Sequence, residues 1–185
     1  EDSKMAEQAV TPSYFEKWKG AKTYSGIPYP KWQIPLISGI GGILAIAALR
    51  VLSVDADVVA CFIVPFGASC VLVFAAPAAP FSQPRNVIGG HFLSALIGVA
   101  IYQIFKEDNA FWMLAVANGL AIAAMAATKT IHPPAGATVF LPIIGCNTDF
   151  MWAVSPVALG AALIVVVGLV YNNVFKARTY PAFWW

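Results

Sequence analysis

Charged residues are scarce in this sequence. Asp, Glu, Lys and Arg together make up 11% of its 185 residues, whereas about 25% is usual for a soluble domain. Hydrophobic residues make up 59% of the chain, and its mean hydropathy is positive. These proportions exclude an ordinary soluble domain and indicate a protein of the lipid bilayer. The net charge of +2 is too small to indicate a nucleic-acid partner.

Metal ligands and catalytic groups are equally scarce. The three cysteines, Cys61, Cys70 and Cys146, lie in apolar runs without C-x-x-C spacing, which is typical of buried hydrophobic residues. The two histidines, His91 and His132, do not stand in a Cys, His and carboxylate cluster of the kind that holds zinc. The sequence also lacks a set of nucleophile, base and orienting group, and it lacks a cofactor motif. We therefore expect no metal site, no cofactor and no enzymatic activity.

Polarity divides the chain into three parts: a polar N-terminal tail (1–33), a transmembrane domain (34–175) and an aromatic C-terminal tail (176–185). The N-terminal tail begins at Glu1 without an initiator methionine and does not contain the apolar core of a signal peptide. We take this as an indication that a presequence was removed. The expected location is an organellar inner membrane, that of a mitochondrion or a plastid.

Six apolar runs follow one another within the transmembrane domain. They are Ile34–Val54, Val58–Ala76, Val87–Phe105, Phe111–Thr128, Ala135–Gly145 and Val157–Val174. The second run is interrupted at Pro65–Ser69, and the fifth is short. From Pro134 to Gly145, 12 residues reach about 18 Å as a helix, against a hydrocarbon core of about 30 Å. The sequence predicts an all-α polytopic membrane protein with about six crossings, made of four full spans and two broken or re-entrant elements.

With six crossings, the basic residues sort onto one side of the membrane. Both tails, Arg85 and Lys129 fall on that side, whereas Arg50 and Lys106 fall on the other. Because Lys and Arg accumulate on the cytoplasmic side or its organellar equivalent, we expect the tails to face the cytosol, stroma or matrix.

A polar stretch with two prolines, Thr130–Thr138, separates the fourth run from the fifth. Pro133 and Pro134 lack an amide donor and have a fixed φ, so the incoming helix must stop at or before His132. Pro134 suits the first turn of a new helix. In hydrocarbon, such a break is tolerated only where the backbone is buried in protein or lines a wet cavity. The stretch is therefore a candidate binding or permeation site.

Two patterns of small residues concern helix packing. The pattern P-x-G-A-[ST] occurs at Pro65–Ser69 and again, 69 positions later, at Pro134–Thr138. If each motif belongs to a repeat of three membrane crossings, the odd number of crossings inverts the second repeat in the membrane relative to the first. The pattern therefore predicts a 3+3 inverted repeat in which Pro65–Ser69 and Pro134–Thr138 lie close together. Gly90, Ser94 and Gly98, spaced by four, predict a small-residue face for close packing of the third helix.

The chemistry of the candidate site suits a small anion. Helix starts at Gly67–Ser69 and Gly136–Thr138 would present unpaired amide donors next to two hydroxyl groups. No acidic residue lies in the runs that hold the nearby basic groups, which favours an anion over a cation or a metal. The candidate binding residues are Gly67, Ser69, Arg85, Asn86, His91, Lys129, His132, Pro133, Pro134, Gly136 and Thr138.

The polar candidates also have structural interpretations. His132 can bridge a broken helix as a neutral residue, and His91 can brace the proline-rich corner through a backbone carbonyl. Arg85 and Lys129 can follow from the preference for basic residues on one side alone. The sequence leaves binding and structural roles open for these four residues.

Three motifs carry a family resemblance: FGAS at Phe66–Ser69, AAPAAPFSQPRNVIGGHFLSALIG at Ala75–Gly98, and HPPAGAT at His132–Thr138. In this order they are similar to the signature of the HPP family of integral membrane proteins, over roughly residues 34–174. The resemblance implies a small multi-helix protein, commonly described with four spans. Because plastid and cyanobacterial members are associated with nitrite transport, it also implies a small-anion transporter or channel.

A different class of function remains open. The chain would then be a non-transporting accessory subunit of a larger organellar membrane complex. The long polar N-terminal tail and the two C-terminal tryptophans, Trp184 and Trp185, would suit docking into such a complex. A homo-oligomer is also compatible with the sequence.

Overall fold

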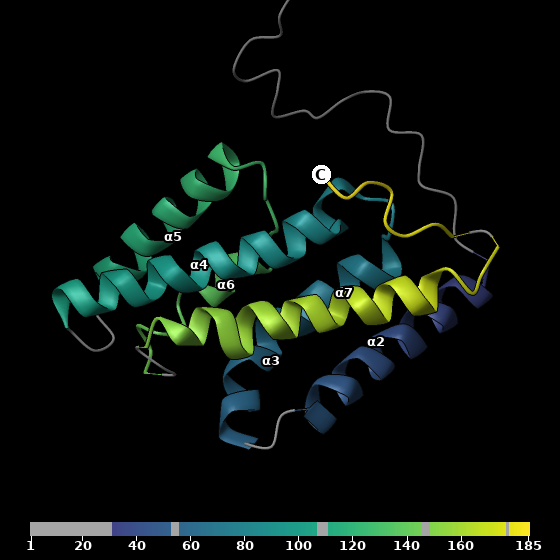
Figure 1. Ribbon diagram of the computed structural model, residues 1–185, viewed down its shortest axis with the longest axis horizontal. Coiled ribbons are helices and arrows are strands. Elements are labelled where there is room, and N and C mark those ends of the chain that lie inside the picture. The colour runs from purple at the N-terminus through teal and green to yellow at the C-terminus, as the bar shows by residue number, and fades with distance from the viewer. Residues whose placement is uncertain (1–30, 53–55, 107–110, 146–148, 177) are drawn as a thin grey trace, which may run out of the picture. The chain divides into compact units, whose positions relative to one another are not determined.

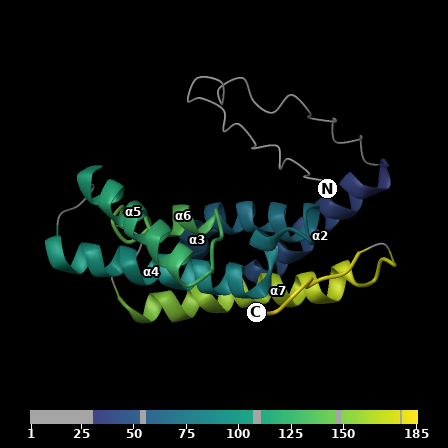
Figure 2. The ribbon, with the colours of Figure 1, turned by 90° about the horizontal axis from the view of Figure 1, so that it is seen from above.

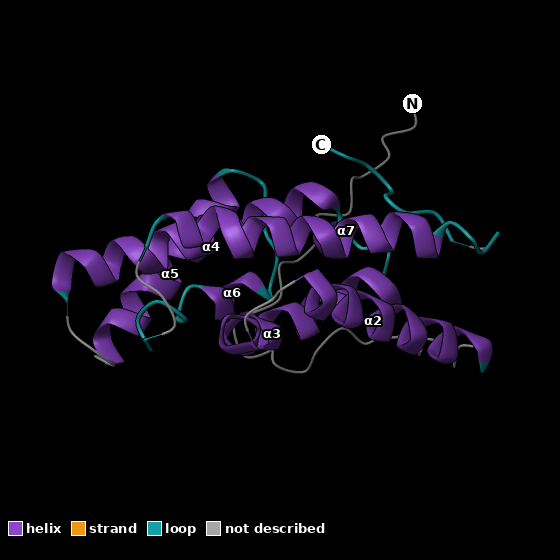
Figure 3. Cartoon of the chain, turned by 60° about the horizontal axis from the view of Figure 1, so that its bottom comes forward, coloured by secondary structure: helices purple, strands orange, loops and turns teal. Residues whose placement is uncertain are grey.

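The computed structural model describes residues 31–52, 56–106, 111–145, 149–176 and 178–185. Every regular element in these ranges is helical (Figure 3). In chain order the elements are α2 (Gln33–Leu52), α3 (Ala56–Cys70), the π-helical η1 (Val71–Ala75), the 3₁₀ turn η2 (Pro80–Ser82), α4 (Pro84–Phe105), α5 (Phe111–Ala127), α6 (Ala135–Thr138), the π-helical η3 (Ala153–Ala158) and α7 (Leu159–Asn172). Most of the expected N-terminal tail lies outside the described ranges, as does Cys146, whereas Cys70 is buried as predicted.

Three helical segments in the described part of the chain are long and apolar enough to cross a bilayer: Gln33–Val51, Pro84–Phe105 and Ala153–Asn172. Two shorter apolar segments, Ile63–Ala75 and Phe111–Ala127, accompany them. The outer surface is apolar as well, since Val64 is 71% exposed, Phe111 82% and Val170 70%. So much exposed apolar surface suits lipid rather than water. The expectation of an all-helical membrane protein is confirmed.

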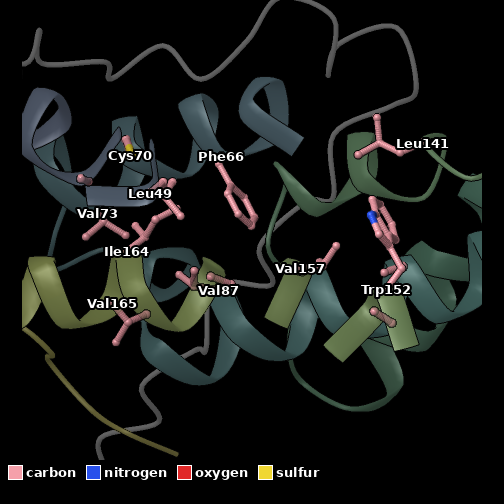
Figure 4. Close-up of a cluster of buried hydrophobic side chains, with 14 of the residues drawn as sticks. Leu49, Phe66, Cys70, Val73, Val87, Leu141, Trp152, Val157, Ile164 and Val165 are labelled. Carbon is pink, nitrogen blue, oxygen red and sulfur yellow. The ribbon is translucent and has the colours of Figure 1, made fainter. Parts of the chain in front are cut away.

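Helices α4 and α7 run side by side through the centre of the bundle (Figure 1). On one side, α2 packs against α7 and against α3 with η1; on the other, α5 and α6 pack against α4 (Figures 1 and 2). Each side has its own core. The larger core includes Leu49, Phe66, Val73, Val87, Trp152 and Ile164 (Figure 4). The smaller core includes Met113, Ala117, Met125, Val139 and Ile143.

The small-residue face of α4 lies against the chain around α6, as its spacing predicted. A Cβ atom added at Gly90 would lie 2.7 Å from His132 Cβ and 3.0 Å from the carbonyl oxygen of Thr130. One added at Gly98 would meet the carbonyl oxygen of Val139 and the ring of Pro142. Only glycine permits so close an approach of helix and backbone. The face therefore holds residues 130–142 directly on α4.

The expected interruption at Pro65–Ser69 is wrong. Pro65 lies inside α3, which runs on to Cys70 and continues into η1. A proline removes one hydrogen bond from a helix, but neighbouring helices can hold such a helix together in the membrane. Pro65 and Phe66 are both buried against those neighbours. Burial between helices has thus outweighed the local signal of the proline.

The interruption at His132 is confirmed. Helix α5 ends at Ala127, and Lys129 adopts a left-handed φ of 58°. Helix α6 then begins at Ala135, directly after Pro134. The fifth apolar run contains this single helical turn and continues as turns to Gly145. The element is short, as its length suggested.

The C-terminal tail ties four helix ends together. The Arg178 guanidinium donates to the carbonyl oxygen of Phe74 at 2.9 Å, to Asn172 Oδ1 at 3.0 Å and to Ser38 Oγ at 3.0 Å. The Tyr180 hydroxyl donates to the carbonyl oxygen of Ser82 at 2.9 Å. Burial raises the pKa of the Tyr180 phenol above its usual range, which keeps it protonated as a donor. The start of α2, the end of η1, the start of α4 and the end of α7 therefore meet at one end of the bundle.

We predict that Gly98→Ala destabilises the protein by about 1–3 kcal/mol, because the new methyl group would overlap the Val139 carbonyl and Pro142. Gly119→Ala is the matched control, since a Cβ atom there meets nothing within 4 Å. Chemical unfolding in detergent micelles measures both variants. Equal stability of the two variants would contradict the close packing of α4 on residues 130–142.

We also predict that Arg178→Ala lowers the free energy of unfolding by about 1.5–3 kcal/mol, because several acceptors lose a charged donor. Lys176→Ala, in the same tail at an exposed position, should change it by less than about 0.5 kcal/mol. Thermal unfolding of the purified variants compares them. A similar effect of both substitutions would show that the tail does not tie the helix ends.

Candidate binding site at the helix break

Four polar side chains from separate parts of the chain meet in the interior. They are Ser69 on α3, His91 on α4, His132 in the break and Thr138 at the end of α6, and all four have an exposed fraction of 0%. Ser69 Oγ lies 2.7 Å from His91 Nε2 and 2.9 Å from His132 Nε2. His91 Nδ1 lies 2.7 Å from Thr138 Oγ1. We call these four residues the histidine network.

Two backbone carbonyl groups complete the histidine network. His132 Nδ1 lies 2.7 Å from the carbonyl oxygen of Phe81, in η2 just before α4. Ser69 Oγ lies 3.1 Å from the carbonyl oxygen of Pro65, one turn earlier on α3. The His91 and His132 rings are 5.0 Å apart at 64°. The edge-to-face contact of Phe66 with His91, at 4.9 Å, closes one side with an apolar ring.

Local sequence explains how each side chain reaches this point. Ser69 faces inward because α3 continues through Pro65. His91 lies on α4 one residue after Gly90, whose missing side chain lets the break approach. The break itself is fixed by Asn86, whose Nδ2 donates to the carbonyl oxygen of Ile131 at 2.8 Å. The single turn of α6 then brings Thr138 onto His91.

The histidine network satisfies its own hydrogen bonds. All four ring nitrogens of the two histidines have partners. No carboxylate takes part in these bonds. In the described part of the chain, no group of three His, Cys, Asp or Glu side chains could hold a metal ion. A ligand of the histidine network would therefore have to replace an existing hydrogen bond.

The expected amide donors at the two helix starts are absent from these positions. Pro65–Cys70 is helix interior. At α6, the amides of Ala135, Gly136 and Ala137 donate to the carbonyl oxygens of His132, Pro133 and Pro134 at 2.9, 3.0 and 3.0 Å. The prediction of unpaired amides at these sites is wrong, because the turn after His132 begins its hydrogen bonding within the break itself.

Several other candidate residues lie apart from the histidine network. Arg85 lines a cavity of about 240 Å³ together with Gly89, Thr130, Trp184 and Trp185. The buried Nε of Arg85 has no hydrogen-bond partner among the described residues. Gly67 lines a different cavity of about 360 Å³, between α3 and α2.

The remaining candidates surround the break without joining the histidine network. Lys129 and Pro133 are exposed, and Pro134 is buried. Gly136 is partly exposed and approaches Asn118 of α5. Sequence reasoning could not identify Phe81 as a partner of His132, since a backbone carbonyl carries no residue-specific signal. Ser94 was assigned to packing, and its buried hydroxyl has no partner in the described part.

We predict that Ser69→Ala destabilises the protein by about 1–3 kcal/mol, because it leaves a buried nitrogen of each histidine without a partner. Ser94→Ala is the matched control, since it removes a buried hydroxyl that has no hydrogen-bond partner among the described residues. It should leave stability unchanged or raise it slightly. Thermal unfolding in one detergent compares the two, and equal losses would refute the bonds assigned to Ser69.

Comparisons with known proteins agree with the motifs and the fold. The family model for the HPP transmembrane region matches residues 27–181. Two transmembrane proteins of Dictyostelium discoideum are similar to the chain. One is 32% identical over 180 residues, covering 93% of this chain and 63% of the relative, and the other is 34% identical over 182 residues, covering 93% and 57%. The chain thus spans about three fifths of the length of these curated relatives. No solved structure matches it. The chain belongs to the HPP family of integral membrane proteins.

Proposed function

We propose that the chain is a membrane transporter or channel for a small anion, with the histidine network in its path. The observation that carries this proposal is the meeting of the two P-x-G-A-[ST] motifs. The hydroxyl of the first motif, Ser69, and that of the second, Thr138, both bond to His91. Both histidines of the chain lie at this one point.

The cost of burying these groups supports a functional role. Polar side chains inside a membrane domain require partners, and ionisable ones usually mark a pathway for substrate, ions or protons. Apolar residues would fill the same space between α3, α4 and α6 without that requirement. The break also places irregular backbone at this point, an arrangement that transporters use to form sites near the midplane.

The charge of the surroundings supports an anion as the substrate. The break and the start of α4 carry Arg85 and Lys129, whereas no acidic residue lies between Val58 and Phe105 or between Phe111 and Cys146. Arg85 lines the cavity beside the break, and its buried Nε has no hydrogen-bond partner among the described residues, so its guanidinium can attract an anion there. Nitrite is our choice of substrate, on the resemblance to plastid and cyanobacterial members.

The proposal includes a topology. Six crossings in a 3+3 inverted repeat would bring the two motif segments together, and α3 does contact α6. The helix ends joined by Arg178 and Tyr180 are those that six crossings place on one side. That side would be the basic side facing the cytosol, stroma or matrix, in an organellar inner membrane.

A second candidate is an accessory subunit of a membrane complex. The closed hydrogen bonding of the histidine network favours it, because every ring nitrogen already has a partner within the chain. In that case the histidine network would serve only to join α3, α4 and α6. The exposed Trp184 and Trp185, at 52% and 84%, would then be contacts for neighbouring subunits.

We predict that His132→Ala and Thr138→Val reduce nitrite flux in proteoliposomes. Loss of a hydrogen bond to a charged group is worth about 1.5–3 kcal/mol, so affinity should weaken roughly ten- to a hundredfold in His132→Ala. Thr138→Val, nearly isosteric, should act more weakly in the same direction. The matched control is Ser94→Ala, which removes a buried hydroxyl that has no hydrogen-bond partner among the described residues.

Stability measured in parallel separates the two candidate functions. Flux that falls more than stability supports the transporter. Normal flux in both variants, or flux that falls only in step with folding, contradicts a substrate contact and favours the subunit.

A further inference from the structure

The hydrogen bonds of the histidine network have a defined direction. A backbone carbonyl only accepts, so His132 Nδ1, 2.7 Å from the Phe81 oxygen, must carry a proton. In a neutral imidazole the other nitrogen is then an acceptor. The Ser69 hydroxyl, 2.9 Å from His132 Nε2, must therefore donate to it.

The donor and acceptor roles at His132 also determine those at His91. Ser69 has one hydroxyl proton, so once it donates to His132 it can only accept from His91 Nε2 at 2.7 Å. His91 Nδ1 is then the acceptor, and the Thr138 hydroxyl donates to it at 2.7 Å. The neutral network is a single chain of donors from Thr138 to Phe81. The two histidines have opposite tautomers.

The geometry also accommodates one additional proton without any heavy atom moving. The Ser69 hydroxyl has a second acceptor, the carbonyl oxygen of Pro65 at 3.1 Å. If the hydroxyl turns to Pro65, its oxygen can accept from both histidines, and His132 Nε2 can then hold a proton. His132 becomes a cation with a hydrogen-bond acceptor for each of its two N–H groups.

His91 is less suited to hold this proton. A proton on His91 Nδ1 would have to point at Thr138 Oγ1, which would then need another acceptor for its own hydrogen. Among the described residues, the Thr138 hydroxyl has no partner besides His91. The additional proton therefore belongs to His132.

We infer that the histidine network is a binding site for a single proton, held on His132 and admitted by rotation of the Ser69 hydroxyl, which couples anion movement to proton movement. The coupling rests on the proposed transport function. The network gains one positive charge when a proton enters from water, and the accompanying anion balances that charge. Both leave together, so the net transport is electrically neutral.

Few other titratable groups surround the histidine network. Among the residues whose side chains the structure describes, those on α3, α4 and α7 are Cys70, Arg85, Tyr102 and Tyr171, and Lys129 follows α5, while α6 and η3 contain none. None of these side chains takes part in the hydrogen bonds of the histidine network. The proton on His132 is thus stabilised by the Phe81 carbonyl and the Ser69 oxygen rather than by a carboxylate.

We predict opposite tautomers in ¹⁵N NMR spectra of the full chain in lipid, with ring-labelled histidine. At alkaline pH, His132 should be protonated at Nδ1 and His91 at Nε2; a His91→Gln variant assigns the two signals. On acidification, His132 should be the first to show two protonated nitrogens. Identical tautomers, or first protonation of His91, would overturn the inference. This measurement needs no transport activity.

Flux measurements in proteoliposomes test the coupling, with a pH-sensitive dye inside and nitrite outside. Protein-free liposomes give the passive leak of nitrous acid. Above that leak, one proton should enter with each nitrite, and Ser69→Ala should reduce this proton uptake at least tenfold while Ser94→Ala matches the wild type. Nitrite flux without protons would overturn the coupling and leave the transporter proposal intact. Absence of nitrite flux would overturn the transporter proposal and the coupling, and leave the proton site to the NMR result.

Discussion

The structure depends on the requirement that polar groups inside hydrocarbon find partners within the chain. At the helix break this requirement is met by pairing side chains with each other and with nearby carbonyls. The hydrogen bonds among Ser69, His91, His132 and Thr138 end at the carbonyl oxygen of Phe81, and the Pro65 carbonyl oxygen is an alternative acceptor for the Ser69 hydroxyl. Because the four residues come from α3, α4, the break and α6, satisfying them fixes the relative positions of these elements.

The hydrogen bonds of the histidine network also depend on close packing of the break against α4. His132 reaches Ser69 only because the break lies directly on α4, and it lies there because Gly90 and Gly98 have no side chains. Asn86 holds the break from the other side through the Ile131 carbonyl. Residues that look like packing residues thus set the geometry of the polar groups. The distinction between structural and functional residues does not follow residue type here.

The sequence predicted those features that depend on local chemistry. Six apolar runs, the stop at His132 and the small face of α4 follow from hydropathy, proline geometry and spacing by four. The continuation of α3 through Pro65 was missed because it depends on burial of Pro65 and Phe66 by distant helices. The donors at α6 were missed for a similar reason, since their partners are carbonyls of the break. The sequence was enough to name Ser69, His91, His132 and Thr138 as candidate site residues. Only the structure shows which of them are joined by hydrogen bonds.

Helix α4 differs from the other described elements in that it contains buried polar side-chain atoms without hydrogen-bond partners. Three buried polar side-chain atoms in the described part have no partner: Arg85 Nε, Asn86 Oδ1 and Ser94 Oγ. All three belong to α4, whereas the histidine network next to them is fully bonded. A buried unpaired polar atom destabilises the state that contains it. Movement of α4 relative to residues 130–142 would break the bonds of His91 to Ser69 and Thr138. The hydrogen bonds of the histidine network and the close glycine contacts of α4 therefore have to offset the cost of these three unpaired atoms.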